Sequence, residues 1–260
     1  MSTTPENFPY TQDPQPAPWG VADPVGYAFK RIFSRNWHMW IGLTLIFIVA
    51  LIAVFAVMVS WVAVPIDGDV NASMSSGQIV ALIVFFVVFI GASVYLTALY
   101  YNAALRETRG EEQTWGTVFK GVPFGRALLS FVVVLGIMLV VYAITALVLF
   151  LASLVSPWLI ALAAILVIVA LIPVTIVLSF VQVYIIDGYS VGDALSAARR
   201  DVLRDFWKVF ASLLLLTVIG YALILVTFGI GLLVYVPLLS LASVFIYRKI
   251  SGGNVAALGS

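Results

Sequence analysis

Seven basic side chains fall in two short segments, each directly before a long uncharged run. They are Lys30, Arg31, Arg35, Arg199, Arg200, Arg204 and Lys208. Ammonium and guanidinium groups bind phosphate and carboxylate, and each gains about 1 kcal/mol beside an anionic leaflet. The pattern favours contact with lipid headgroups or with a partner protein, while the simpler role is to anchor the chain and fix its topology.

Acidic side chains offer few candidates for catalysis. Asp187 ends an uncharged run. We expect its carboxylate to accept a hydrogen bond from Arg199 or Arg204, or to cap the turn before Ser190. A second acidic group lies beside two arginines and is typical of a solvated loop with local ion pairs. That group contains Glu107, Glu111 and Glu112, with Arg106 and Arg109.

The composition excludes several kinds of site. With no cysteine and one histidine, His38, the chain cannot form a disulfide, an iron–sulfur cluster or a haem held by two histidines. Facing carboxylate pairs, a nucleophile elbow and a phosphate-binding glycine loop are also lacking. We therefore expect no enzyme activity, no cofactor and no metal.

The basic residues are positioned by an expected helix over residues 190–208. Ser190 and Asp193 match a helix N-terminal cap. Apolar residues at spacings of three and four then share one face, with the arginines off it. That face contains Val191, Ala194, Leu195, Ala198, Val202 and Phe206. We expect this helix to lie on the membrane surface before Trp207 leads into a span.

Two weaker copies of this pattern occur upstream. One begins at Asp23, expected as a cap, with Pro24 in the first helical position. The other covers residues 115–120. Because each copy precedes two uncharged runs, we infer three repeats of an amphipathic surface helix followed by two spans.

The remainder of the chain predicts an all-α, polytopic membrane helix bundle. Hydrophobic residues make up 63% and charged residues 10%, far from the values of soluble proteins. Six runs are long enough to cross the hydrocarbon layer. The predicted membrane domain covers residues 23–250, between a tail at 1–22 and another at 251–260. Its spans are expected at about 38–64, 79–102, 127–154, 158–186, 209–227 and 232–247.

All 13 lysines and arginines fall on one side of these spans. Under the positive-inside rule both termini are expected in the cytoplasm, in the inner (plasma) membrane. Residues 1–22 contain five prolines and no lysine or arginine, which predicts a retained cytoplasmic tail. We expect this tail to be either a disordered extension or an arm that binds other membrane subunits. A net charge of +1 argues against nucleic acid as a partner.

The expected spans contain no ionisable side chain. Gln182, Thr97, Thr175 and Thr217 are the polar residues nearest to candidates, and we expect neighbouring helices or their own backbone to satisfy them. Pro173 and Pro237 are expected to kink spans four and six.

The segment around residue 190 also resembles a known pattern. The residues that carry the resemblance are Asp187, Ser190, Val191, Asp193, Ala194, Leu195, Asp205, Phe206 and Trp207. They are similar to a motif of bacterial six-span proteins related to the membrane domain that accompanies some glycerophosphodiester phosphodiesterases. The resemblance implies an all-helical membrane module without established catalytic residues.

Two functions fit these features. The first is a non-catalytic accessory, assembly or stabilising subunit of a respiratory or cell-envelope complex, in contact with anionic headgroups of the cytoplasmic leaflet. The second is a transporter or lipid-handling protein that moves an uncharged or amphiphilic substrate between spans four and six.

Overall fold

The protein is built from helices alone in the part of the chain that the structure describes. The computed structural model describes residues 18–34, 36–62 and 75–256. The helices in these ranges are α1 (Asp23–Ile32), α2 (Trp37–Val62), α3 (Ser76–Thr108), α4 (Phe124–Ser153), α5 (Pro157–Asp187), α6 (Val191–Arg204), α7 (Phe206–Val226) and α8 (Leu232–Ile250).

Six of these helices are long and apolar enough to cross a membrane. They are α2, α3, α4, α5, α7 and α8, and they coincide with the six expected spans to within a few residues. The largest difference is at α3, which continues to Thr108 and so carries Glu107 on its last turn. The all-α, six-span fold is confirmed.

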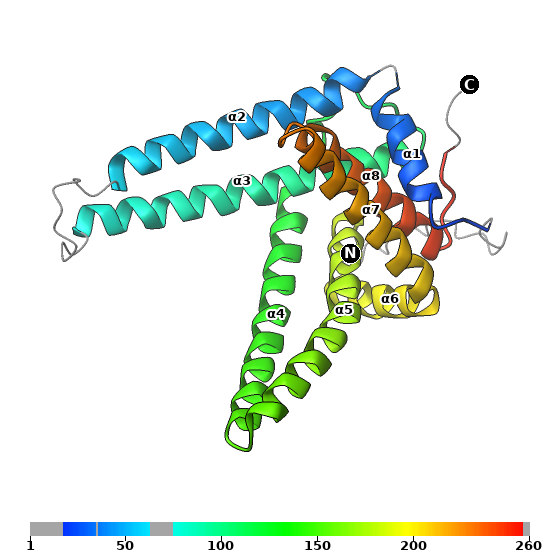
Figure 1. Ribbon diagram of the computed structural model, residues 1–260. Coiled ribbons are helices and arrows are strands. Elements are labelled where there is room, and N and C mark those ends of the chain that lie inside the picture. The colour runs from blue at the N-terminus through cyan, green and yellow to red at the C-terminus, as the bar shows by residue number, and fades with distance from the viewer. Residues whose placement is uncertain (1–17, 35, 63–74, 257–260) are drawn as a thin grey trace, which may run out of the picture.

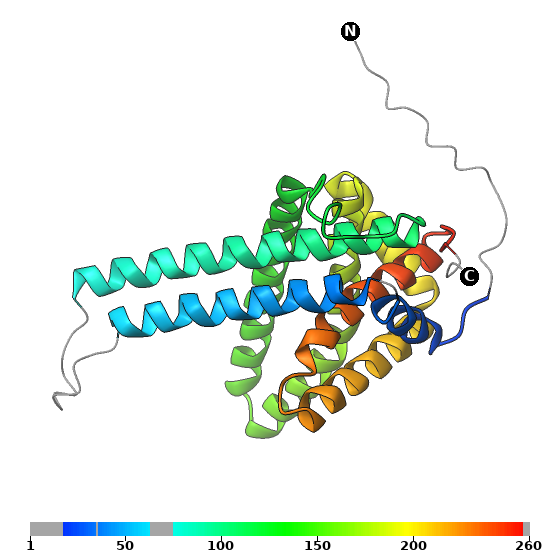
Figure 2. The ribbon, with the colours of Figure 1, turned by 90° about the horizontal axis from the view of Figure 1, so that it is seen from above.

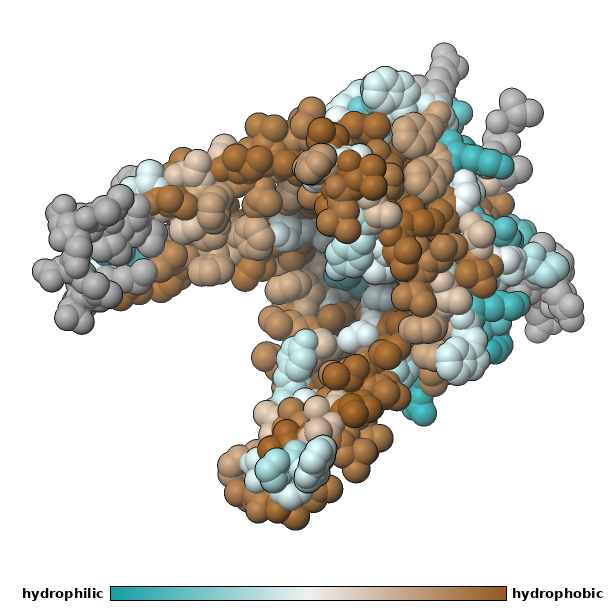
Figure 3. Space-filling model, in the orientation of Figure 1, coloured by the Kyte–Doolittle hydropathy of each residue, from teal (hydrophilic) through white to brown (hydrophobic). Residues whose placement is uncertain are grey.

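The spans form three hairpins that diverge from a common base. The α2–α3 and α4–α5 hairpins extend in different directions, and their tips lie far apart (Figures 1 and 2). In Figure 3 both arms are covered by apolar residues, with a hollow between them, and hydrophilic residues concentrate at the opposite side, near α1, α6 and the end of α8. We call that side the charged end.

Helix α8 lies at the centre of the base. It contacts α1, α2, α3, α5 and α7, and 61% of its most apolar segment is buried inside the protein. The corresponding segment of α4 is 0% buried, because α4 packs mainly on α5 and otherwise faces outward. The compact core therefore lies around α8 and the adjoining ends of α3 and α5, and the outer parts of the α2–α3 and α4–α5 hairpins contribute little to it.

Two of the three expected surface helices form. In α6 the apolar residues Ala194, Ala198 and Val202 are fully buried, while Arg199 and Arg200 are exposed, as the periodicity predicts. The apolar face of α6 packs on α5. In α1 the matching face packs mainly on α8.

The third expected surface helix, over residues 115–120, is absent; the segment forms consecutive turns. The Thr117 hydroxyl accepts the backbone N–H of Thr114 at 2.9 Å, a local bond that competes with helical pairing. Gly121 then adopts a left-handed backbone with φ of 66°. The repeat is therefore complete in two copies only.

The cap at Ser190 is confirmed, since its hydroxyl accepts the Asp193 N–H at 3.3 Å. The cap at Asp23 is not. Helix α1 begins at Asp23 itself, whose carboxylate accepts the backbone N–H of Gly20 at 2.6 Å.

Three of the polar residues in the spans are satisfied locally, as expected. Thr97, Thr175 and Thr217 each donate to a backbone carbonyl four residues earlier, at 2.8–3.0 Å. A hydroxyl bonded in this way leaves no strong donor for a substrate.

Candidate functional site

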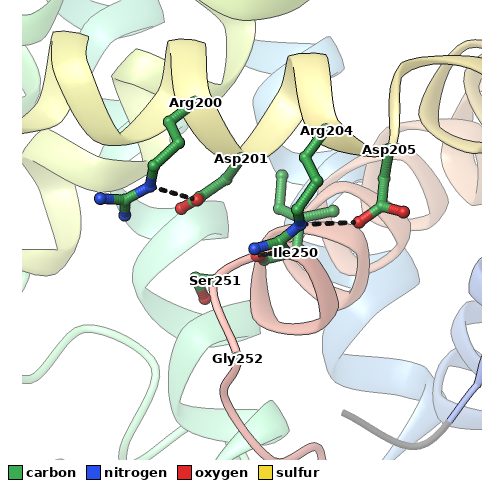
Figure 4. Close-up of a pocket in the computed structure, with 7 residues that line it drawn as sticks. All are labelled: Arg200, Asp201, Arg204, Asp205, Ile250, Ser251 and Gly252. Carbon is green, nitrogen blue, oxygen red and sulfur yellow. Dashed lines mark hydrogen bonds and ion pairs between the residues drawn. The ribbon is translucent and has the colours of Figure 1, made fainter. Parts of the chain in front are cut away.

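A groove at the charged end brings together two of the predicted arginines. It lies between the last turns of α6 and the end of α8, with a volume of about 460 Å³. Figure 4 shows Arg200 and Arg204 projecting from α6 above the backbone that follows α8. The groove is lined by Arg200, Asp201, Arg204, Asp205, Ile250, Ser251 and Gly252.

The first arginine of the groove is bound by its neighbour in sequence. Arg200 Nε donates to Asp201 Oδ1 at 3.0 Å, and this bond raises the pKa of the guanidinium above its ordinary value. Asp201 is buried and also accepts the Tyr184 hydroxyl at 2.6 Å. The carboxylate therefore joins α6 to the end of α5.

The second arginine joins α6 to α8. Arg204 donates through Nη2 to the carbonyl of Ile250 at 2.6 Å and through Nε to Asp205 at 3.4 Å. Ile250 is the last residue of α8, where backbone carbonyls lack partners within the helix. A guanidinium at this position satisfies one carbonyl and complements the helix dipole.

The charges in this groove compensate one another. Two guanidinium groups face two carboxylates, and each arginine is already bonded to an aspartate. An incoming anion would have to compete with these carboxylates. The arrangement fits a joint between α5, α6 and α8 better than an anion-binding site.

Asp187 forms a second joint of the same kind. It accepts the Tyr247 hydroxyl at 2.6 Å and an Nη2 hydrogen of Arg109. The expected partners, Arg199 and Arg204, are wrong: both lie on α6 beyond the turn at Gly188, whereas Arg109 follows α3 and reaches the end of α5. The rings of Tyr184 and Tyr247 meet edge to face at 4.7 Å, so the two joints are contiguous.

The predicted headgroup contact Arg31 is buried instead. Its Nη1 lies 3.2 Å from Glu107 Oε1, with side chains only 9% and 5% exposed. Glu107 also accepts the backbone N–H of Gln113 at 3.0 Å. Glu107 was expected in a solvated loop, but α3 extends far enough to place it beneath α1. The other expected local pair does form, between Arg106 and the exposed Glu111 at 2.7 Å.

The remaining predicted residues have different surroundings. Arg199 and Lys208 are exposed, and Arg35 lies outside the described residues. Lys30 is exposed on α1 and lines a separate groove with Lys249 of α8. Sequence patterns missed Lys249 because nothing in its own segment links it to α1. Its place in the last turn of a span was the available signal.

Comparisons of this chain with family models, with characterised proteins and with solved structures find no match. Among the described residues, no three His, Asp or Glu side chains are grouped so that they could hold a metal ion.

Proposed function

We propose that this integral membrane protein is a non-catalytic accessory or assembly subunit of a larger membrane complex. The observation that carries the proposal is the low self-burial of the arms. None of the most apolar segment of α4 is buried, and exposed fractions reach 60% at Val140 and 65% at Val87 of α3. Helices in a membrane associate through close packing with other helices, which these faces lack within the chain.

The charged end supports the same role. Its carboxylates are held in bonds to arginine and tyrosine, at Asp187, Asp201 and Glu107. Carboxylates held in this way stabilise the part of the fold from which the hairpins diverge, rather than exchange protons with a substrate. A rigid base with diverging arms is suited to holding other helices in the hollow between the α2–α3 and α4–α5 hairpins (Figure 3).

The test is site-specific photo-crosslinking in cells. A benzoyl-phenylalanine would replace Val140 or Ile144 on α4, and Val218 on α7 as a matched position of similar exposure. We expect the α4 positions to capture one protein of defined mass that also co-purifies in fixed stoichiometry. Capture only of lipid, or identical products from Val218, would contradict the role as a subunit.

A second candidate function, lipid handling, is favoured by one observation. An apolar groove of about 290 Å³ lies beside Pro173, between α5 and the α6–α7 junction, and is lined by Val169, Ile172, Pro173, Leu203, Phe206, Trp207 and Phe210. It differs from the path expected between spans four and six, because α8 does not line it. Crosslinks to lipid alone, strongest at this groove, would favour lipid handling.

Topology and kinship remain part of the proposal. All 13 lysines and arginines lie on one side of the spans. This segregation supports placing the charged end in the cytoplasm of a bacterial cell, with the spans in the plasma membrane. The motif around Ser190 supports kinship with the membrane domain that accompanies glycerophosphodiester phosphodiesterases. Its Ser190 and Asp193 form the cap of α6, and its Asp187 contributes to the joint with α8.

A further inference from the structure

A second groove at the charged end lies between α1, the last turns of α8 and the segment that follows α8. Its volume is about 360 Å³. Aromatic side chains form much of its wall. The rings of Tyr27 and Phe245 are 5.1 Å apart, and Trp19, just before α1, is 8% exposed.

Two lysines line this groove from different helices. Lys30 comes from α1 and Lys249 from α8, and the ammonium of Lys249 lies 5.7 Å from the centre of the Phe245 ring. Cation–π contact at this distance holds the ammonium over the aromatic wall without neutralising its charge. Within the described residues, neither lysine forms an ion pair with a carboxylate.

The charge of this groove differs from that of the groove between α6 and α8. Its single carboxylate, Asp23, is bonded to the N–H of Gly20, so the lining carries two positive charges and one negative charge. The other groove carries two of each sign. An anion entering beside Lys30 and Lys249 would meet two ammonium groups that are not already paired with an aspartate.

We propose that the groove lined by Lys30 and Lys249 binds the phosphate of an anionic phospholipid headgroup. Lys249 is the penultimate residue of α8, a span, and its ammonium therefore lies where the hydrocarbon layer gives way to headgroups. Lysines at span ends extend toward that layer, and tryptophan and tyrosine are enriched there. The proposal does not depend on the role as an accessory subunit.

The same ammonium groups would attract free phosphate, so the experiment separates the two sources. Native mass spectrometry of the detergent-purified full chain would measure binding of added phosphatidylglycerol, with zwitterionic phosphatidylcholine, which has no net charge, as the reference. Inorganic phosphate would be added as a competitor. We expect tighter binding of phosphatidylglycerol, and no displacement by equimolar phosphate.

The variant K30Q/K249Q removes both ammonium groups. At about 1 kcal/mol for each lysine near a phosphate, the apparent affinity for phosphatidylglycerol should fall roughly fivefold per substitution, or about 25-fold in the pair. The variant K30R/K249R keeps both charges and should retain most of the affinity. Each single glutamine variant should show the fivefold loss if the double variant does not fold.

The matched control is K120Q/R126Q, which removes two exposed charges on the same side of the spans but outside the groove. Its affinity should remain close to that of the native chain. An equal loss in the control would mean general attraction to basic protein and would overturn the proposal. Displacement of lipid by equimolar phosphate, or unchanged binding in K30Q/K249Q, would overturn it as well.

Discussion

Arg31 of α1 and Glu107 of α3 form an ion pair at 3.2 Å in which both side chains are almost fully buried. The pair ties the first helix to the end of the second span, directly beside α8. Removing one partner of a buried pair leaves a charge without compensation, which costs far more than the loss of an exposed pair.

We predict that Glu107→Gln lowers the free energy of unfolding by about 3–5 kcal/mol. Unfolding by SDS titration in mixed micelles, followed by tryptophan fluorescence, would measure the change. The control is Glu111→Gln, because Glu111 forms an exposed pair with Arg106 and should cost less than about 1 kcal/mol. Equal effects of the two substitutions would show that burial does not strengthen the Arg31–Glu107 pair.

The contact between Tyr184 and Asp201 should stabilise the joint between α5 and α6. A hydrogen bond to a charged group contributes about 1.5–3 kcal/mol, so Tyr184→Phe should reduce stability by that amount. A double-mutant cycle with Asp201→Ala should give a coupling energy of about 1 kcal/mol or more. Tyr221→Phe, on an exposed ring, provides the reference. Additive effects of the two substitutions would argue against the bond.

Helices α7 and α8 approach closely at Gly220. A Cβ atom added there would lie 2.1 Å from the Tyr235 ring. Gly220→Leu should therefore force the hairpin apart and destabilise the protein by at least about 1–3 kcal/mol. Gly136→Leu in α4 is the matched substitution, since a Cβ there meets no atom within 4 Å. A native melting temperature for Gly220→Leu would rule out this contact.

The cap of α6 offers a local test. Ser190→Ala should cost about 1 kcal/mol and should speed hydrogen exchange at the Asp193 amide, because that N–H loses its acceptor. Ser196→Ala, in the same helix, removes a hydroxyl that caps no helix end and should leave this amide unchanged. Unaltered protection of Asp193 after Ser190→Ala would contradict the assignment of the cap.

The helices could be predicted because their signals are local. Continuous apolar runs place the spans, and spacings of three and four place Ala194, Ala198 and Val202 on one face of α6. The cap at Ser190 depends on residues three apart. The failed prediction at residues 115–120 was also local, since threonine side chains there bond the backbone and support a turn.

The contacts at the charged end were less predictable because they join residues that lie far apart in the sequence. Arg31 meets Glu107, Asp187 meets Tyr247, and Lys30 shares a groove with Lys249. Nothing in either partner's own segment specifies these pairings. They follow from the central position of α8 and from the extension of α3 to Thr108, both of which are tertiary features.

The central position of α8 has a consequence for biogenesis. A ribosome releases the spans in sequence, so α1, α2 and α3 leave the exit tunnel long before the helix on which they pack has been made. Until residue 250 has been synthesised, the nascent chain can bring the first two hairpins together through α3, α4 and α5, but it lacks the helix on which α1, α2 and α3 pack. The core around α8 can therefore be completed only after the last span has been made.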